Sequence, residues 1–206
     1  EPQRTNLIPY SEYLSGSQAT PNYNQTTSPE GVDNGLLLIE NTATNTHGNL
    51  RSATIPTNAN AVDYTISIFA KKKEREYIQF SFYSDGALVN SNGFDLINGT
   101  TDGDASTHKI EDYGNGWYRC SYTQRITQST GGYNFVRVQM GPNAGTFYYQ
   151  GDGSSGVFLY GLQFEAGFYP TSYIPTYGVS QTRLSDNCEN TDIDLLSQDA
   201  ATYLLE

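Results

Sequence analysis

The segment GNGWYRCSYT, residues 114–123, places the only tryptophan of the chain two residues before an arginine. If the segment is extended, Trp117 and Arg119 share one face, and Tyr118 and Cys120 share the other. An indole ring can stack on the apolar C–H face of a sugar ring, and a guanidinium group forms planar hydrogen bonds to hydroxyl groups. The face that carries Trp117 therefore has the residue types of a sugar-binding surface.

The same alternation runs through the segments 76–84, 133–140 and 156–165. In each segment apolar side chains predominate on one face, and the other face carries amides, arginines and aromatic rings. Together the polar faces yield eight candidate carbohydrate-binding residues: Tyr77, Gln79, Tyr83, Trp117, Arg119, Arg137, Gln139 and Gln163. The alternative interpretation is an ordinary solvated sheet face on which Trp117 covers a loop.

The apolar faces of these segments predict the core. They contribute these side chains: Ile78, Phe80, Phe82, Val136, Val138, Met140, Tyr118, Cys120, Tyr122, Phe158, Tyr160, Leu162 and Phe164. Residues 60–72 alternate in the same way, except that Phe69 falls among the polar positions. We expect Cys120 to be a small buried hydrophobic residue; a disulfide with Cys188 is the alternative.

Turn signals such as DG, NG, GG and GDG separate nine or ten short strand-like segments, and long helix-forming windows are nearly absent. This pattern predicts an all-β fold, a two-sheet antiparallel β-sandwich of jelly-roll type. We expect one module over residues 1–186. Residues 187–206 become acidic and then apolar, which indicates a linker and the start of a following, truncated domain or an exchanged strand.

The formal net charge of −11 argues against nucleic acid as a partner, because such binding depends on Lys and Arg at phosphates. No window reaches the eighteen apolar residues of a membrane span, and the N-terminus has no signal-peptide pattern. We therefore expect neither nucleic acid nor membrane as a partner. The basic run KKKERE, 71–76, fits a solvated strand end.

Catalytic motifs are missing from the sequence, which has no HExxH, no GxSxG and no paired cysteines or histidines at metal-ligand spacing. A glycosidase needs two carboxylates across a cleft, and the acidic residues fall mostly in turns or at strand ends. A lyase that uses tyrosine stays open as an alternative, since Arg137 could neutralise a charge. We expect a protein that is not an enzyme.

Five segments resemble the carbohydrate-binding-module-like domains of bacteriophage tail, fibre and head-spike proteins. These domains are similar in fold to the jelly-roll modules, of the family 4/9/22 type, that are attached to polysaccharide-degrading enzymes. The resemblance covers most of residues 6–186 and is most specific in FEAG, PTSYIPT and TR near its end. The segments are NLIPYSE (6–12), SPEGVDNG (28–35), YTISIFAK (64–71), YGNGWYRCSYT (113–123) and GVFLYGLQFEAGFYPTSYIPTYG with QTRLSD (156–186).

The resemblance implies a non-catalytic module that recognises a host-surface polysaccharide or cell-surface glycan, located on the virion or outside the cell. The alternatives are a purely structural virion domain and a module appended to a secreted polysaccharide-degrading enzyme. Implied partners are the glycan, other virion subunits, neighbouring domains of a longer chain, and further copies in a homo-oligomer. The Tyr- and Pro-rich stretch 168–177 fits either an interface or a belt across the sandwich.

The resemblance also implies a candidate cofactor, since many such modules hold a structural calcium ion near the chain ends. Gly161 stands where an acidic ligand would be expected. Glu40 and Glu165 are then the candidate calcium ligands, because carboxylate oxygens are preferred by this cation.

Overall fold

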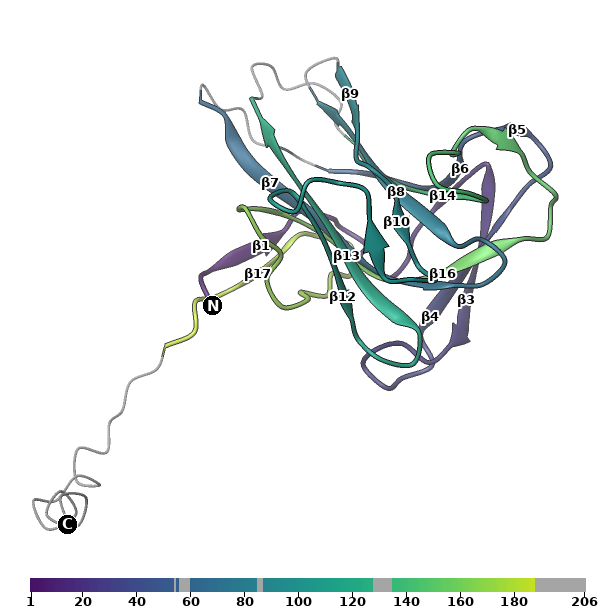
Figure 1. The fold of residues 1–206 in the computed structure, drawn as a ribbon. Helices are drawn as coiled ribbons and strands as arrows, with labels where there is room; N and C mark the ends of the chain where they lie inside the picture. The colour runs from purple at the N-terminus through teal and green to yellow at the C-terminus, as the bar shows by residue number, and fades with distance from the viewer. Residues whose placement is uncertain (54, 56–59, 85–86, 128–134, 188–206) are drawn as a thin grey trace, which may run out of the picture.

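The computed structural model describes residues 1–53, 55, 60–84, 87–127 and 135–187. The described residues form two large antiparallel sheets packed face to face, with two small two-stranded sheets at the periphery (Figure 1). None of these residues is assigned to a helix, so none forms a helix that could span a membrane. The prediction of an all-β, two-sheet antiparallel sandwich of jelly-roll type is confirmed.

The first sheet, named the β8 sheet, has seven strands. Its order is β11–β10–β8–β14–β6–β2, and β9 also pairs with β8. The strands are β2 (Gly16–Ser17), β6 (His47–Ser52), β8 (Tyr77–Ser84), β9 (Ala87–Asn90), β10 (Phe94–Asp95), β11 (Thr100–Thr101) and β14 (Phe135–Gly141).

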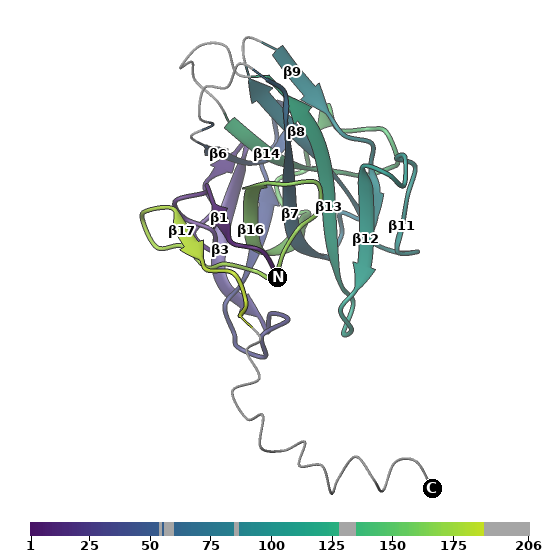
Figure 2. The same ribbon diagram turned by 90° about the vertical axis from the view of Figure 1, so that its left-hand side faces the viewer.

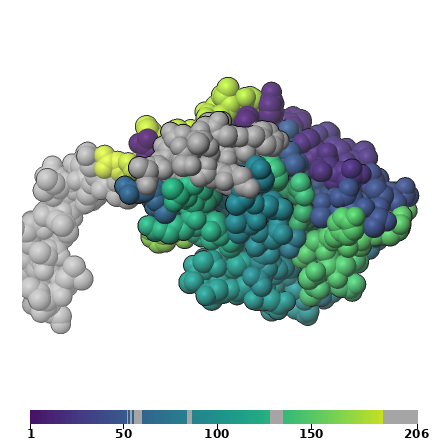
Figure 3. Space-filling model, turned by 90° about the horizontal axis from the view of Figure 1, so that it is seen from above, coloured from purple at the N-terminus to yellow at the C-terminus, as the bar shows by residue number. Residues whose placement is uncertain are grey.

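The second sheet, named the β7 sheet, has six strands in the order β12–β13–β7–β16–β4–β3. They are β3 (Ala19–Thr26), β4 (Gly35–Glu40), β7 (Val62–Lys72), β12 (His108–Asp112), β13 (Trp117–Ile126) and β16 (Gly156–Ala166). The small sheets pair β1 (Arg4–Asn6) with β17 (Gln181–Arg183), and β5 (Thr44–Asn45) with β15 (Tyr149–Gln150). Figure 2 shows β17 beside β1, and Figure 3 shows the N-terminal and C-terminal ends of the described chain side by side at the surface.

The core lies between the two sheets, where the predicted apolar faces meet. Ile78, Phe80 and Phe82 of β8 are no more than 1% exposed, and they belong to the same buried cluster as Cys120 and the apolar residues of β7 and β14. Burying such side chains contributes about 1.5–3 kcal/mol each. The predicted core faces of β8, β13 and β14 are therefore confirmed, and Cys120 is a buried free thiol.

Strand β16 departs from the predicted alternation. Leu159 faces the core, whereas Tyr160 packs on the outer side of the β7 sheet with Phe69 and Trp117. The predicted core positions of Phe158 and Tyr160 are wrong, because Phe158 packs against the same outer cluster. The predictions for Leu162 and Phe164 are confirmed, since both are fully buried in the core. The alternation thus reverses between residues 160 and 162.

The reversal has a local cause at Gly161. The pairing of β16 with β7 shifts register between Tyr160 and Gln163, which is the mark of a β-bulge. Gly161 has a φ of 62°, a left-handed conformation that glycine adopts readily and other residues rarely. The extra residue turns Tyr160 outward and returns Leu162 to the core.

Residues 168–177 cross the outer face of the β7 sheet and are named the belt. Arg119 donates from Nη2 to the Thr171 carbonyl oxygen over 2.6 Å. The Ile174 amide donates to Gln163 Oε1 over 2.7 Å. Of the two interpretations of this stretch, the belt across the sandwich is confirmed. Residues 188–206, including Cys188, lie outside the described residues, so the expectations for that tail stay predictions.

Replacement of Gly161 by alanine tests the bulge. The change forces a left-handed conformation on a residue with a Cβ, which costs about 1–2 kcal/mol. The new Cβ would also lie 3.2 Å from the Tyr173 ring and 3.3 Å from the Phe69 ring. We expect Gly161→Ala to lower the free energy of unfolding by more than about 2 kcal/mol, measured by urea denaturation.

Gly145→Ala is the matched control. Gly145 has a φ of 72°, and a Cβ there would have no atom within 4 Å. It therefore reports the backbone cost alone. Equal destabilisation by the two substitutions would contradict the close packing around the bulge.

Candidate functional site

The eight predicted carbohydrate-binding residues do not share one surface. Those from segments 76–84 and 133–140 lie on the outer face of the β8 sheet, and those from 116–125 and 156–165 lie on the outer face of the β7 sheet. The two outer faces of a sandwich point in opposite directions. The eight residues therefore do not form one binding face, because strand alternation gives a side of a strand and not the sheet to which that strand belongs.

The three residues on the β7 sheet are buried. Trp117 is 2% exposed and donates from Nε1 to the Thr27 carbonyl oxygen over 3.0 Å, so its ring lies under a loop, as the alternative interpretation had it. Gln163 is fully buried and bonds the belt, and Arg119 is 5% exposed. Trp117 therefore offers no exposed ring for stacking on this side.

The other five residues, Tyr77, Gln79, Tyr83, Arg137 and Gln139, lie together on the outer face of β8 and β14, named the β8 face. Their floor is a row of polar side chains. Gln79 pairs with Gln139 across the two strands, and its amide donates to Gln139 Oε1. The Ser81 hydroxyl donates to Asn90 Oδ1 over 2.7 Å, and its oxygen lies 3.3 Å from Gln139 Oε1. This network fixes the orientation of the amides.

An aromatic pair stands at one end of the β8 face. The rings of Tyr83 and Phe135 are stacked with centroids 5.2 Å apart and an interplanar angle of 2°. The guanidinium carbon of Arg137 lies 5.3 Å from the Phe135 ring centroid, and Nη1 donates to Thr46 Oγ1 over 3.1 Å. Phe135 was absent from the predicted set, although the alternation places it on the same face as Arg137; the pairing of β14 with β8 then places it opposite Tyr83.

Tyr77 lies at the other end of β8, six residues from Tyr83, which is about 20 Å along a strand. It borders a small cavity of about 90 Å³ that Asp95 and Thr100 also line. Burial, and then the Asp95 carboxylate, raise the pKa of Tyr77. Its hydroxyl therefore stays a neutral hydrogen-bond donor at physiological pH.

The two candidate calcium ligands are engaged by hydrogen-bond donors. The oxygens of Glu40, which is 2% exposed, accept from Arg75 twice, from the Tyr149 hydroxyl over 2.6 Å and from the Asp152 amide over 2.8 Å. An ionised carboxylate has about four acceptor positions, so donors fill them. Arg75, expected as part of a solvated basic run, is the ion-pair partner of a buried acid.

Hydrogen-bond donors also engage the carboxylate of Glu165. Its oxygens accept from the Gln163 amide over 2.5 Å, from the Thr171 amide over 2.9 Å and from the Thr171 hydroxyl over 2.8 Å. Within the described ranges, no group of three or more His, Cys, Asp or Glu side chains could hold a metal ion. The contacts of Glu40 and Glu165 thus favour structural roles over calcium ligation.

Comparison with known proteins gives distant structural similarities. No family model matches the chain, and no curated protein matches it. The CBM22-1–GH10 modules of Clostridium thermocellum endo-1,4-β-D-xylanase 10B, solved with xylohexaose, match at 12% identity and a TM-score of 0.45, over 85% of this chain and 30% of theirs. The enzymatically active domain of bacteriophage CBA120 tailspike protein 4 matches at 12% identity and a TM-score of 0.41, over 79% and 21%.

A smaller structure is covered almost completely. The CBM22-1 xylan-binding domain of Paenibacillus barcinonensis Xyn10C matches at 12% identity and a TM-score of 0.42, over 80% of this chain and 92% of that one. By contrast, this chain spans less than a third of the xylanase and about a fifth of the tailspike chain.

Because hydrogen-bond donors already engage the Glu40 oxygens, we can predict how the stability of the protein depends on calcium and on pH. Burial alone would raise the pKa of Glu40, but the bonds from Arg75, Tyr149 and Asp152 outweigh it and hold the pKa below 4.5. The resulting stability is present above pH 4.5 and is lost as the pH falls through the folded-state pKa. We expect Glu40→Gln to cost about 3 kcal/mol at pH 7, because it leaves Arg75 with only the more exposed Asp152, 3.2 Å away, as an ionic partner.

The measurement is thermal unfolding at pH 7 and below pH 4.5, each with added calcium and with a chelator. The difference between wild type and Glu40→Gln should shrink at the lower pH, and calcium should not shift the unfolding temperature of the wild type. A calcium-dependent rise that Glu40→Gln abolishes would establish a metal site at Glu40.

Proposed function

We propose that the chain is a non-catalytic glycan-recognition module that binds a polysaccharide or cell-surface glycan on the β8 face. The observation that carries the proposal is the parallel Tyr83–Phe135 pair beside Arg137 and the Gln79–Gln139 amides. Aromatic rings offer the apolar contact that a sugar ring needs, and amides and guanidinium groups bond its hydroxyls.

The polar side chains of the β8 face support ligand binding more than catalysis. In the part that the structure describes, the outer side of β8 and β14 carries amide, hydroxyl and guanidinium groups, of which Gln139 and Ser81 are buried at 3% and 0% exposure, where a glycosidase would need a pair of carboxylates. The paired Gln79 and Gln139 amides bond each other beside Ser81 and cannot reorient freely, so a ligand that matches them binds without a large ordering cost. The arrangement fits reversible binding.

The proposal also covers the kind of protein that contains the module. The resemblance of residues 6–186 to bacteriophage domains supports a fibre, spike or tail protein at the virion surface. A module appended to a secreted polysaccharide-degrading enzyme would use the same face.

A purely structural role is the second candidate function, and exposed tyrosines favour it. Tyr10, Tyr13 and Tyr177 are 45%, 53% and 64% exposed, and Tyr10 forms a β-bridge with Tyr177. Exposed aromatic side chains are typical of surfaces that pack against a neighbouring subunit. This surface lies near the belt and not on the β8 face.

The double variant Tyr83→Ala, Arg137→Ala tests glycan binding on the β8 face. An aromatic contact contributes about 0.5–1.5 kcal/mol and a hydrogen bond from a charged group about 1.5–3 kcal/mol. We expect affinity for the bound polysaccharide to fall by about 30-fold or more. The ligand is first found on a glycan array, and affinity gel electrophoresis then compares the proteins.

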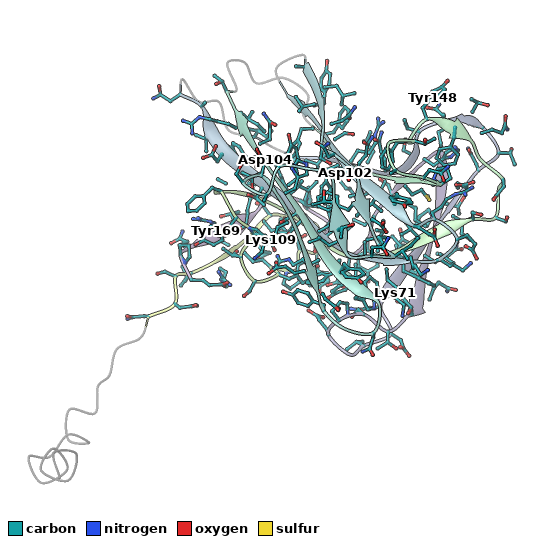
Figure 4. All side chains as sticks on the ribbon, in the orientation of Figure 1. Lys71, Asp102, Asp104, Lys109, Tyr148 and Tyr169 are labelled. Carbon is teal, nitrogen blue, oxygen red and sulfur yellow. The ribbon has the colours of Figure 1, made fainter. Side chains whose placement is uncertain are left out.

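The matched control is Phe168→Ala, Arg125→Ala, which removes one exposed ring and one exposed arginine on the side of the β7 sheet. Tyr169, the neighbour of Phe168, is labelled in Figure 4. Equal loss of binding in both double variants would refute the β8 face. No binding by the wild type to any glycan, together with a trimer or larger assembly in light scattering, would support the structural role.

A further inference from the structure

A second cavity lies on the opposite side of the sandwich. It has a volume of about 490 Å³, within the range of about 300–1,000 Å³ that is common for small-molecule sites. Phe69, Arg119 and Tyr160, all at most 5% exposed, contribute its deepest lining, and Tyr113 and the belt residue Tyr173 line it nearer the surface. It is named the aromatic pocket.

The rings of the pocket meet at steep angles. The Phe69 and Tyr113 centroids are 4.9 Å apart at 77°, and those of Phe69 and Tyr173 are 6.4 Å apart at 87°. Tyr160 and Tyr173 are 5.4 Å apart at 65°. These edge-to-face contacts stabilise the lining in the absence of any ligand. They leave ring surfaces on more than one wall, so that a compact ring can be held from several sides.

Two buried donors of the pocket are poorly satisfied. The hydroxyl of Tyr160, which is 2% exposed, makes no hydrogen bond of full distance and angle geometry within the described part of the chain. Burial raises the pKa of this hydroxyl, and the Glu30 carboxylate lies near enough to raise it further. Arg119 uses Nη2 for Ser67 Oγ and the Thr171 carbonyl, but its Nε has no acceptor there. An unsatisfied buried polar group costs about 1–3 kcal/mol. A ligand with acceptor atoms at the bottom of the pocket would remove that cost.

The charged side chains around the pocket determine which ligand charge it favours. Glu1, Glu30 and Glu111 line it, and Lys109, labelled in Figure 4, is paired with Glu111 over 2.7 Å. An anion would meet these carboxylates, and a cation would meet the buried guanidinium group of Arg119. Hydroxyl groups of a ligand suit both the bottom and the rim of the pocket, because they can accept hydrogen bonds from Arg119 and Tyr160 and donate to the carboxylates at the rim.

We propose that the aromatic pocket is a second binding site, which takes one uncharged, hydroxyl-rich ring at the end of a neutral oligosaccharide. The aromatic walls contact the apolar faces of the ring, and Arg119 Nε and the Tyr160 hydroxyl donate to its oxygens. This proposal shares the ligand class of the proposed function but not its site. The two sites lie on opposite outer faces and can therefore fail separately.

Trp117 provides a reporter for this site alone. It is the only tryptophan of the chain and packs with Phe69 and Tyr160 beneath the pocket. A ligand that enters the pocket changes the surroundings of Trp117, whereas a ligand on the β8 face does not reach it. The probes are millimolar cellotriose, xylotriose, maltotriose, mannotriose and galactotriose, with triglucuronate as the charged comparison.

The decisive variant is Tyr160→Phe, which removes only the buried hydroxyl. We expect it to keep or raise the unfolding temperature while weakening the binding of the active trisaccharide at least fivefold. Tyr113→Ala, which removes a wall that is 47% exposed, should weaken binding as well. Tyr83→Ala, Arg137→Ala should leave the Trp117 response intact.

Several outcomes would overturn the proposal. They are no Trp117 response to any neutral trisaccharide, tighter binding of triglucuronate than of the neutral probes, and wild-type affinity in Tyr160→Phe. Loss of the Trp117 response in Tyr83→Ala, Arg137→Ala would also overturn it, because binding would then depend on the opposite face. A response that survives this double variant while glycan-array binding is unchanged would refute the β8 face and retain the pocket.

Discussion

The β-bulge at Gly161 determines how the β7 sheet is divided between core and surface. Without the extra residue, Tyr160 would lie on the same face as Leu162 and Phe164 and would compete with them for the core. With it, β16 supplies aliphatic side chains to the core and an aromatic ring to the outer face. The left-handed conformation there needs glycine, and so does the closeness of the Tyr173 ring.

The outer aromatic face created by the bulge must be covered, and the belt covers it. A segment without regular structure brings unpaired peptide groups, which buried polar side chains have to satisfy. Arg119 and Gln163 do this for Thr171 and Ile174, and Glu165 accepts from Thr171. Polar residues on an outer strand face can therefore act as anchors for the protein's own backbone instead of ligand contacts.

Much of the fold could be predicted from the sequence because period-two alternation records which side of a strand is buried. It succeeded for β8, β13 and β14, where no bulge interrupts the strand. It failed at Tyr160, since a bulge depends on pairing with β7 that one segment does not reveal. Phe69 was the visible sign of the outer aromatic cluster, as the one apolar residue out of phase in its strand.

The candidate site was predictable only in part for a related reason. Strand faces were inferred correctly for all eight residues, yet their assignment to sheets depends on pairing between distant segments, such as β8 with β14. Burial of Trp117 and Gln163 depends on the loop and the belt that lie over them. Tyr113 and Tyr173 lie in loops without a period, so no pattern linked them to Tyr160.

The buried thiol of Cys120 has a practical consequence. It is fully enclosed between the sheets, and burial raises its pKa, so the reactive thiolate is suppressed in the folded protein. A small alkylating reagent reaches this sulfur only when the sandwich opens. The alkylation rate of Cys120 therefore measures how often the sandwich opens. This measurement needs no bound ligand.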